Sequence, residues 1–251
     1  MKDRNVQAYL DRIGYRGSLN PVPETLRALH VAHLQTVPFE NLSIHAGQPI
    51  VLTEDALFEK VVLRRRGGFC YELNGLFAAL LRALGFEVDL LAAGVARAGG
   101  GYGPDFDHVA LAVSPGGRWL ADVGFGDSFR EPLRLDERGE QAEGDRAYQI
   151  DEDGDRLLLL QRKGADWEPQ FRFTLQPRAL ADCAEMCLYH QTSPQSHFTR
   201  RRICSLATPD GRVTLSDSRL ITTRGGARQE RMLETEEEHA ATLRELFGIV
   251  V

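Results

Sequence analysis

The chain contains no apolar stretch long enough to cross a membrane, and charged residues occupy the N-terminus, where a secretion signal needs an apolar run. Both absences predict a cytoplasmic protein that does not insert into a membrane. Cysteine is also scarce, because the 251 residues include only four, at 70, 183, 187 and 204. These are too few and too scattered for a disulfide framework, so we expect free thiols in a reducing compartment.

An excess of positive charge is missing as well. Lys and Arg together number 30 against 36 Asp and Glu, which gives a formal net charge of -6 and a pI near 5.7. This balance excludes a general nucleic-acid binder. The basic clusters at 64–66 and 200–202 are short and flanked by apolar residues, a pattern that favours ion pairs over contacts with a phosphate backbone.

Motifs for phosphate and metal binding are absent too. The glycine-rich segment 99–103 is followed by neither a Lys-Ser/Thr pair nor a helical pattern, so we expect a flexible loop there. Cys183, Cys187 and His190 are spaced for one helix face, but a zinc site needs a fourth ligand and usually has closer cysteines. We expect these three side chains to pack in the protein, and we expect no metal cofactor.

The hydrophobic pattern that is present changes along the chain. Up to residue 85 it is helical, in segments near 5–13, 23–36, 54–65 and 70–84. From residue 86 it becomes a series of short alternating runs, at 86–97, 107–113, 118–124, 147–151, 156–162 and 170–176. The last part mixes the two, with a helix near 178–190, strands near 200–207 and 212–222, and a final helix that begins with a capping-box pattern at Thr235 and Glu238.

These patterns predict an α+β protein in three parts. A helical bundle occupies residues 1–85, a central antiparallel, barrel-like β domain occupies 86–190, and a C-terminal α/β lid occupies 191–251. No internal repeat is visible. A core of useful size is expected for a chain of this length.

Cys70 is the residue with the strongest chemical signal. It follows the glycine pair 67–68 and begins a helix whose apolar face is formed by Leu73, Leu76, Phe77, Leu80, Leu81 and Leu84. The unpaired N–H groups and the macrodipole of the first helical turn favour a thiolate. We therefore predict a reactive cysteine, although a small buried core residue is the alternative for any free cysteine.

A cysteine nucleophile needs a base, and the base needs an orienting acid. Of the seven histidines, four (His30, His33, His45 and His239) look like surface or core-edge residues, and His190 and His197 lack an evident acid nearby. His108 differs, because it starts a strand whose return strand carries Asp122. If the turn between them is centred on Pro115, the two residues face each other, with Cβ atoms about 5 Å apart. Asp107 points to the opposite face of the strand.

Several motifs together resemble the arylamine N-acetyltransferase family. They are R-G-G-F-C-Y-E-L-N at 66–74, D-H-V-A-L at 107–111, W-L-A-D-V-G-F-G at 119–126, V-P-F-E-N-L at 37–42 and T-S-P-Q-S-H-F at 192–198. The last match departs from the usual family pattern, which has an asparagine before a Ser-Thr-x-Pro segment. This resemblance implies the same three-part fold, with a helical bundle, a β domain and an α/β lid.

The resemblance implies a cysteine-protease-like Cys-His-Asp arrangement in which Cys70 is the nucleophile, His108 the base and Asp122 the orienting acid. It also implies an ion pair between Glu40 and Arg66. Three aromatic residues would line the substrate pocket, and one glycine would lie where acetyl-CoA approaches: Phe39, Phe125, Phe198 and Gly126.

The function implied is acetyl transfer from acetyl-CoA, as cosubstrate, to the nitrogen of a small arylamine or hydrazine, or to the oxygen of an N-hydroxyarylamine, through an acetyl-cysteine. Such a role belongs to xenobiotic metabolism. The sequence leaves open an amide synthase with a tethered acyl donor, a cysteine hydrolase that uses the same three residues, and a non-enzymatic binding module. It also leaves open the acceptor, the preferred acyl chain and whether the chain forms a homodimer.

Overall fold

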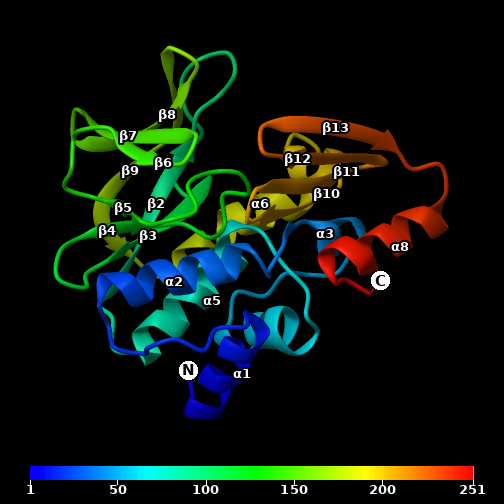
Figure 1. Ribbon diagram of the computed structural model, residues 1–251, viewed down its shortest axis with the longest axis horizontal. Helices are drawn as coiled ribbons and strands as arrows, with labels where there is room; N and C mark the ends of the chain where they lie inside the picture. Colours follow the sequence, from blue (N-terminus) through cyan, green and yellow to red (C-terminus); the bar gives the residue numbers. More distant parts are fainter. Residues whose placement is uncertain (251) are drawn as a thin grey trace.

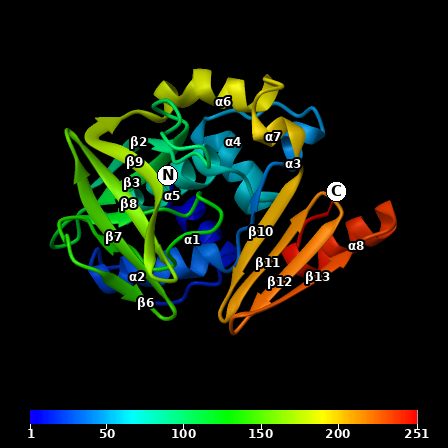
Figure 2. The same ribbon diagram turned by 90° about the horizontal axis from the view of Figure 1, so that it is seen from above.

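The computed structural model describes residues 1–250 and contains a helical layer with two antiparallel sheets above it (Figures 1 and 2). One sheet has eight strands, curls strongly and lies over the N-terminal helices on one side of the molecule. The other has five strands and lies beside it, with the C-terminal helix packed against it. This arrangement confirms the mixed α and β fold with a barrel-like sheet that the sequence predicts.

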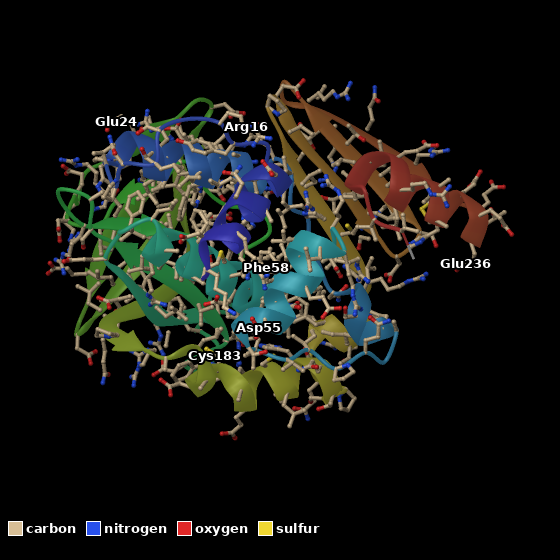
Figure 3. All side chains as sticks on the ribbon, turned by 90° about the horizontal axis from the view of Figure 1, so that it is seen from below. Arg16, Glu24, Asp55, Phe58, Cys183 and Glu236 are labelled. Atoms are coloured by element: carbon tan, nitrogen blue, oxygen red, sulfur yellow. The ribbon has the colours of Figure 1, made fainter. Side chains whose placement is uncertain are left out.

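The helical layer matches the predicted segments to within a few residues. Its elements are α1 (Asp3–Arg12), α2 (Pro23–Leu34), α3 (Leu42–His45), α4 (Glu54–Phe58), a π-helical turn (Glu59–Leu63) and α5 (Cys70–Ala83). Pro23 is suited to the first turn of α2, where its missing N–H has no helical partner. The predicted helix 54–65 is thus in part a π turn. Phe58 lies inside this layer, whereas Glu236 lies at the outer end of the last helix (Figure 3).

The eight-stranded sheet has the order β5-β4-β3-β2-β9-β8-β7-β6. Its strands are β2 (Val88–Val95), β3 (His108–Val113), β4 (Trp119–Ala121), β5 (Leu133–Arg134), β6 (Gln141–Glu143), β7 (Arg146–Asp153), β8 (Arg156–Lys163) and β9 (Asp166–Arg178). Two of them, β5 and β6, were not predicted because two or three residues are too few to show an alternating pattern. Strand β9 is longer than predicted and is bulged relative to both neighbours.

The hairpin that carries His108 and Asp122 has a different register from the predicted one. Ala121 lies opposite Leu111, so the position facing His108 is that of Gly124, and Asp122 lies just beyond the end of β4. The turn is therefore centred one residue later than Pro115, and Gly116 and Gly117 take positive φ angles of 72° and 135° there. A shift of two positions keeps Asp122 on the same face, which is why the predicted contact survives the wrong register.

The five-stranded sheet has the order β1-β10-β11-β12-β13, with β1 (Phe39–Glu40), β10 (Ile203–Thr208), β11 (Gly211–Ser216), β12 (Arg219–Arg224) and β13 (Ala227–Met232). The predicted strand 212–222 was wrong, because Asp217 turns the chain with a φ of 50° and divides it in two. Strand β13 was missed because its residues are all exposed and show no apolar alternation.

The helices between and after the sheets also differ in detail from the prediction. The segment predicted as one helix at 178–190 is a 3-10 turn (Leu180–Cys183) followed by α6 (Ala184–Thr192), and a short α7 (His197–Arg200) follows. In α8 (Glu236–Phe247), Thr235 caps the N-terminus by accepting the Glu238 N–H at 3.1 Å. The Glu238 carboxylate accepts from the N–H of Glu234 and so does not complete a capping box.

Three clusters of buried apolar side chains hold these layers together. The first joins the helices to one face of β2 and β3, the second fills the curl of the eight-stranded sheet, and the third lies between the five-stranded sheet and α8. Strand β1 comes from the N-terminal part of the chain and pairs with β10. The five-stranded sheet, called the lid sheet below, is therefore connected to the helical layer. The domain boundaries at 85 and 190 stay predictions. Within residues 1–250, no helix has the length and apolarity that a membrane crossing requires.

Candidate active site

Cys70 is the first residue of α5, and it is almost fully buried. The preceding residue, Phe69, has extended backbone, and its N–H is accepted by the Glu72 carboxylate at 3.2 Å, which fixes the start of the helix. On the other side the chain at Gly124 comes so close that a Cβ there would lie 2.7 Å from the Cα of Cys70. A glycine is therefore required at 124 to let the two backbones meet.

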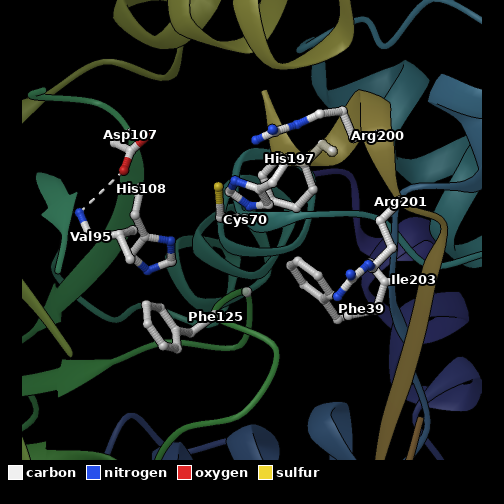
Figure 4. Close-up of a pocket in the computed structure, with 12 residues that line it drawn as sticks. Phe39, Cys70, Val95, Asp107, His108, Phe125, His197, Arg200, Arg201 and Ile203 are labelled. Carbon is white, nitrogen blue, oxygen red and sulfur yellow. Dashed lines mark hydrogen bonds between the residues drawn. The ribbon is translucent and has the colours of Figure 1, made fainter. Parts of the chain in front are cut away.

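His108 and Asp122 form a short, buried hydrogen bond. The Nε2 atom of His108 lies 2.6 Å from Oδ2 of Asp122, and the two side chains are 3% and 0% exposed. Because Nε2 is used in this way, Nδ1 is the ring nitrogen left for the thiol. Figure 4 shows the His108 ring and the Cys70 sulfur bordering the same space. The structure thus brings together the three residues from which the sequence prediction builds a reactive site.

Asp122 is held by more groups than the sequence analysis found. Its Oδ1 accepts the side-chain amide of Asn74 at 2.8 Å and the N–H of Gly124 at 2.9 Å. Asn74 also donates to the Val109 carbonyl and accepts the Val123 N–H, so it bridges α5 and the hairpin. The signal was available in the sequence, because Cys70 and Asn74 are four residues apart and share a helix face.

His30 is the second residue that the sequence analysis misjudged. It is fully buried on α2, stacked on Phe129, and its Nε2 accepts the backbone N–H of Asp122 at 3.0 Å. Its Nδ1 donates to the Arg130 carbonyl at 2.6 Å. Burial lowers the pKa of His30 to about 4, so the ring is neutral at pH 7 and keeps Nε2 free to accept. The expectation of a core-edge histidine was therefore wrong.

The electrostatics of Cys70 correct a second expectation. Burial raises the pKa of the Cys70 thiol well above its ordinary value, and the negative charge of Asp122 raises it further. The first turn of α5 alone therefore does not produce a thiolate in this site. A thiolate at Cys70 needs a positive charge beside the sulfur. The residue with an ionisable side chain that borders the same cavity and is held by Asp122 is His108.

The space above Cys70 is a cavity of about 690 Å³. Its aromatic wall contains Phe39, Phe125 and Phe198, and the ring of Phe125 packs edge-on against His108 with centroids 5.1 Å apart. Phe198 comes from α7, so this helix closes one side of the cavity. Figure 4 shows His197 and Arg200 of the same helix at the edge of this space. Gly126 lies beside this wall with a φ of 96°, and a Cβ there would approach the Phe39 ring at 3.4 Å.

Glu40 and Arg66 form an ion pair below the cavity wall. The Nη2 atom of Arg66 lies 2.8 Å from Oε1 of Glu40, whose side chain is fully buried. The other oxygen, Oε2, accepts the N–H of Leu42 at 2.7 Å. Glu40 therefore connects the side chain of Arg66 to the backbone just after β1, next to Phe39.

His190 and His197 do have an acid nearby, contrary to expectation. The Nε2 atom of His190 lies 3.4 Å from Oδ1 of Asp107, and His197 lines the cavity together with Asp107. Asp107 does point away from Asp122, as predicted, and its Oδ2 accepts the Val95 N–H at 3.3 Å. Burial is the largest single influence and opposes the charge on Asp107. His190, the Val95 N–H and His108 together outweigh it and hold the pKa of that carboxyl below its usual value.

The remaining cysteines are free thiols in the protein interior. Cys183 and Cys187 belong to the main core, and burial raises the pKa of each thiol to about 12. His190 makes contacts with Ser196 and Asp107 instead of joining them in a cluster. Among residues 1–250, no group of three or more His, Cys, Asp or Glu side chains is placed to hold a metal ion.

Known proteins match this chain in sequence and in fold. Residues 23–251 fit a family model described as N-acetyltransferase. The arylamine N-acetyltransferase of Mycolicibacterium smegmatis is 37% identical over 248 residues, covering 96% of this chain and 90% of that protein. The structure of the Mycobacterium tuberculosis arylamine N-acetyltransferase superposes with a TM-score of 0.91 at 35% identity, covering 97% and 93% of the two chains.

A third relative was solved with a ligand. The Mycobacterium marinum arylamine N-acetyltransferase in complex with CoA superposes with a TM-score of 0.90 at 35% identity, covering 97% of this chain and 92% of that one. The class is therefore that of the acetyl-transferring enzymes. Within it, the chain belongs to the arylamine N-acetyltransferase family, which confirms the family predicted from the motifs.

Proposed function

We propose that this enzyme transfers an acetyl group from acetyl-CoA to the nitrogen of arylamines or arylhydrazines, through an acetyl group carried on Cys70. The observation that carries the proposal is the shared cavity of Cys70 and His108, with His108 held by the buried Asp122. The CoA complex of the Mycobacterium marinum relative supports acetyl-CoA as the cosubstrate. No metal has a part in this chemistry.

In the first half-reaction, His108 takes the thiol proton and the Cys70 sulfur attacks the thioester carbonyl carbon. A new C–S bond forms, the bond to the CoA sulfur breaks, and the His108 imidazolium returns its proton to the departing sulfur. Nucleophile and leaving group are both thiolates, so the exchange is close to balanced in energy. Asp122 holds the Nε2–H of the imidazole, which directs Nδ1 toward the sulfur.

In the second half-reaction, the acceptor amine attacks the carbonyl carbon of acetyl-Cys70. An arylamine is largely neutral at pH 7, so its nitrogen lone pair is available without prior deprotonation. His108 accepts the proton lost from the nitrogen, and the C–S bond to Cys70 breaks to restore the thiolate. The same sequence of steps transfers the group to the oxygen of an N-hydroxyarylamine.

The cavity fits an aryl acceptor and a thioester that arrive in turn. Phe39, Phe125 and Phe198 supply flat apolar surface for the ring. Gly126, which has no side chain and lies beside Phe39, leaves room for the acyl-CoA to approach. We place this reaction in the cytoplasm and in the metabolism of foreign amines.

Intact-mass analysis after mixing with acetyl-CoA alone tests the proposal. We expect one acetyl group per wild-type chain and none on Cys70→Ala, with Cys204→Ala as a matched control that keeps the adduct, since Cys204 is buried in the lid sheet. An unmodified wild type, or the same adduct on Cys70→Ala, would sink the proposal. Loss of the adduct in water without an amine, as fast as with one, would indicate a hydrolase, and a donor requirement other than acetyl-CoA would indicate an amide synthase.

A further inference from the structure

The segment 184–200 comprises α6 and α7 and is called the lid segment below. It completes the wall of the cavity, so its position determines the shape of the acceptor site. It contributes His197, Phe198 and Arg200 to the lining. From the helical layer, Asn41 holds this segment by donating to the carbonyls of Phe198 and Arg201 at 2.9 and 2.7 Å. The contact from the eight-stranded sheet is made through His190.

His190 connects the sheet to the cap of α7. It is 2% exposed, and its Nε2 lies 3.4 Å from Oδ1 of Asp107, the residue directly before β3. Its Nδ1 lies 3.1 Å from Oγ of Ser196, which in turn accepts the N–H of Phe198 at 3.2 Å. A continuous path of polar contacts therefore runs from Asp107 to the backbone of Phe198.

The hydrogen positions along this path follow from the acceptors at its ends. If the Ser196 oxygen accepts the Phe198 N–H and donates its own hydrogen to Nδ1 of His190, the ring hydrogen lies on Nε2, the nitrogen nearer to Asp107. Within residues 1–250 Nε2 makes no hydrogen bond, so its 3.4 Å contact with the Asp107 carboxylate is an electrostatic one. Ser196 is buried and already used as a helix cap, which excludes it as a second nucleophile.

The His190 ring also packs on the residue that it positions. It stands edge-on to the Phe198 ring with centroids 5.2 Å apart, and it lies near Tyr71, the neighbour of Cys70. Asp107 and His108 are consecutive and point to opposite faces of β3. The same strand end therefore carries the partner of the lid and the proposed base, so the two are fixed relative to each other.

We propose that Asp107, His190 and Ser196 form a positioning relay that holds Phe198 over Cys70 and sets the affinity for the amine acceptor. His190 is a positioning residue and takes no part in bond making. The inference rests on the proposed acetyl transfer, since it concerns the acceptor half of that reaction. The relay acts on the lid wall, so it affects the second half-reaction more than the first.

Two substitutions of one residue test the relay. His190→Leu keeps apolar packing but removes both polar contacts, whereas His190→Gln keeps one donor and one acceptor. For His190→Leu we expect the KM for an arylamine to rise about tenfold, while the rate of Cys70 acetylation by acetyl-CoA alone changes by less than about twofold. For His190→Gln we expect a smaller rise, to a KM no more than about threefold above that of the wild type.

Trypsin gives a second readout that does not depend on activity. Arg200 and Arg201 are exposed at the end of α7, and a lid released from Asp107 should be cut there several times faster than in the wild type. His239→Leu is the matched control, because it removes a buried histidine from α8 at the far side of the lid sheet (Figure 1). It should change neither the KM nor the cleavage rate at 200–201.

An unchanged KM in His190→Leu overturns the relay, whatever trypsin shows. Equal losses in both half-reactions also overturn it, because they indicate a general structural role. Rescue by His190→Gln together with the selective rise in KM supports it. Failure of the underlying function is distinguishable, since in that case the wild type itself forms no acetyl-Cys70.

Discussion

On one face of β3, His108 meets Asp122 at 2.6 Å, and on the other face Asp107 meets His190 at 3.4 Å. Both are pairs of an imidazole and a carboxylate that begin at adjacent residues, but Asp122 is fully buried whereas the Asp107 side chain is 18% exposed. The first pair is enclosed by groups of α2, α5 and the hairpin that bond to Asp122 from several sides. The second bridges two separate layers and has a longer contact.

The difference shows how one pair of residue types serves two purposes. Around Asp122 each oxygen has a donor, so the imidazole of His108 is held in one orientation. Between Asp107 and His190 there is a single polar contact, which connects the eight-stranded sheet to the segment that carries Phe198. The short, fully hydrogen-bonded pair belongs to the residue that we propose as the base, and the longer contact belongs to the residue that we propose as a positioning residue.

The largest expected effect on the acetylation rate comes from removing the negative charge of Asp122, the partner of His108. In Asp122→Asn the Oδ1 atom still accepts from Asn74 and Gly124, so the fold is kept. The amide in place of Oδ2 donates to Nε2, which moves the ring proton to Nδ1 and blocks proton uptake from Cys70. We expect Cys70 acetylation to slow about 10³-fold, measured by stopped-flow mass analysis.

Asp136→Asn provides the control for that change, because Asp136 pairs with Arg118 at the surface and lies outside the cavity. Its acetylation rate should equal that of the wild type. A near-wild-type rate in Asp122→Asn would mean that Asp122 acts only as a structural residue, and the contrast between the two pairs would lose its chemical meaning.

The next effect is a dependence of stability on pH that comes from His30. Its pKa is about 4 in the fold and 6.5 when unfolded, so the unfolded chain binds a proton first as pH falls. The contribution of His30 to the free energy of unfolding is therefore fully present above pH 6.5. It falls by about 3 kcal/mol as the pH decreases toward 4. Urea unfolding at a series of pH values measures it.

The variants for this test are His30→Gln and His45→Gln. The glutamine at 30 can accept the Asp122 N–H without titrating, so the slope of the unfolding free energy between pH 6.5 and 4 should flatten. His45 is exposed, and its replacement should leave the slope unchanged. The same slope in all three proteins would show that His30 is not the group responsible.

The smallest effect concerns the cap at the lid end of the relay. Ser196→Ala removes the side-chain acceptor of the Phe198 N–H and should cost about 1 kcal/mol of unfolding free energy. Thr53→Ala removes a comparable cap from α4 at a distance from the cavity. We expect each variant to lose about 1 kcal/mol of unfolding free energy or less. The KM for the acceptor should rise, about threefold, in Ser196→Ala alone. Equal KM values in steady-state assays would contradict a special role for the lid cap.

Much of the fold follows from local pattern. The start of α5 at Cys70 was predicted to the residue, because a glycine pair and a strong apolar stripe define it. The contact of His108 with Asp122 was predicted from hairpin geometry, although the register was wrong by two positions. Turn geometry at Gly116 and Gly117 depends on two positive φ angles that residue pattern does not specify.

The residues that the sequence analysis missed interact with partners far along the chain. His30 bonds to Asp122 across 92 positions, and Asp107 and His190 come from different layers. No local period or spacing connects such residues. Burial of His30 was missed for the same reason, since an amphipathic helix does not reveal how deep its face will lie.

The backbone N–H of Asp122 donates to His30 of α2, and its carboxylate accepts from Asn74 of α5 and from Gly124 of the β3 hairpin. These elements belong to different parts of the chain. A molecule in which the helices have formed but have not docked on the sheet would contain Cys70 and His108 without a working acid. During refolding, acetylation of Cys70 should therefore return later than the helical signal in circular dichroism. Acetylation of Cys70 therefore measures the fraction of molecules in which the helices have docked on the sheet.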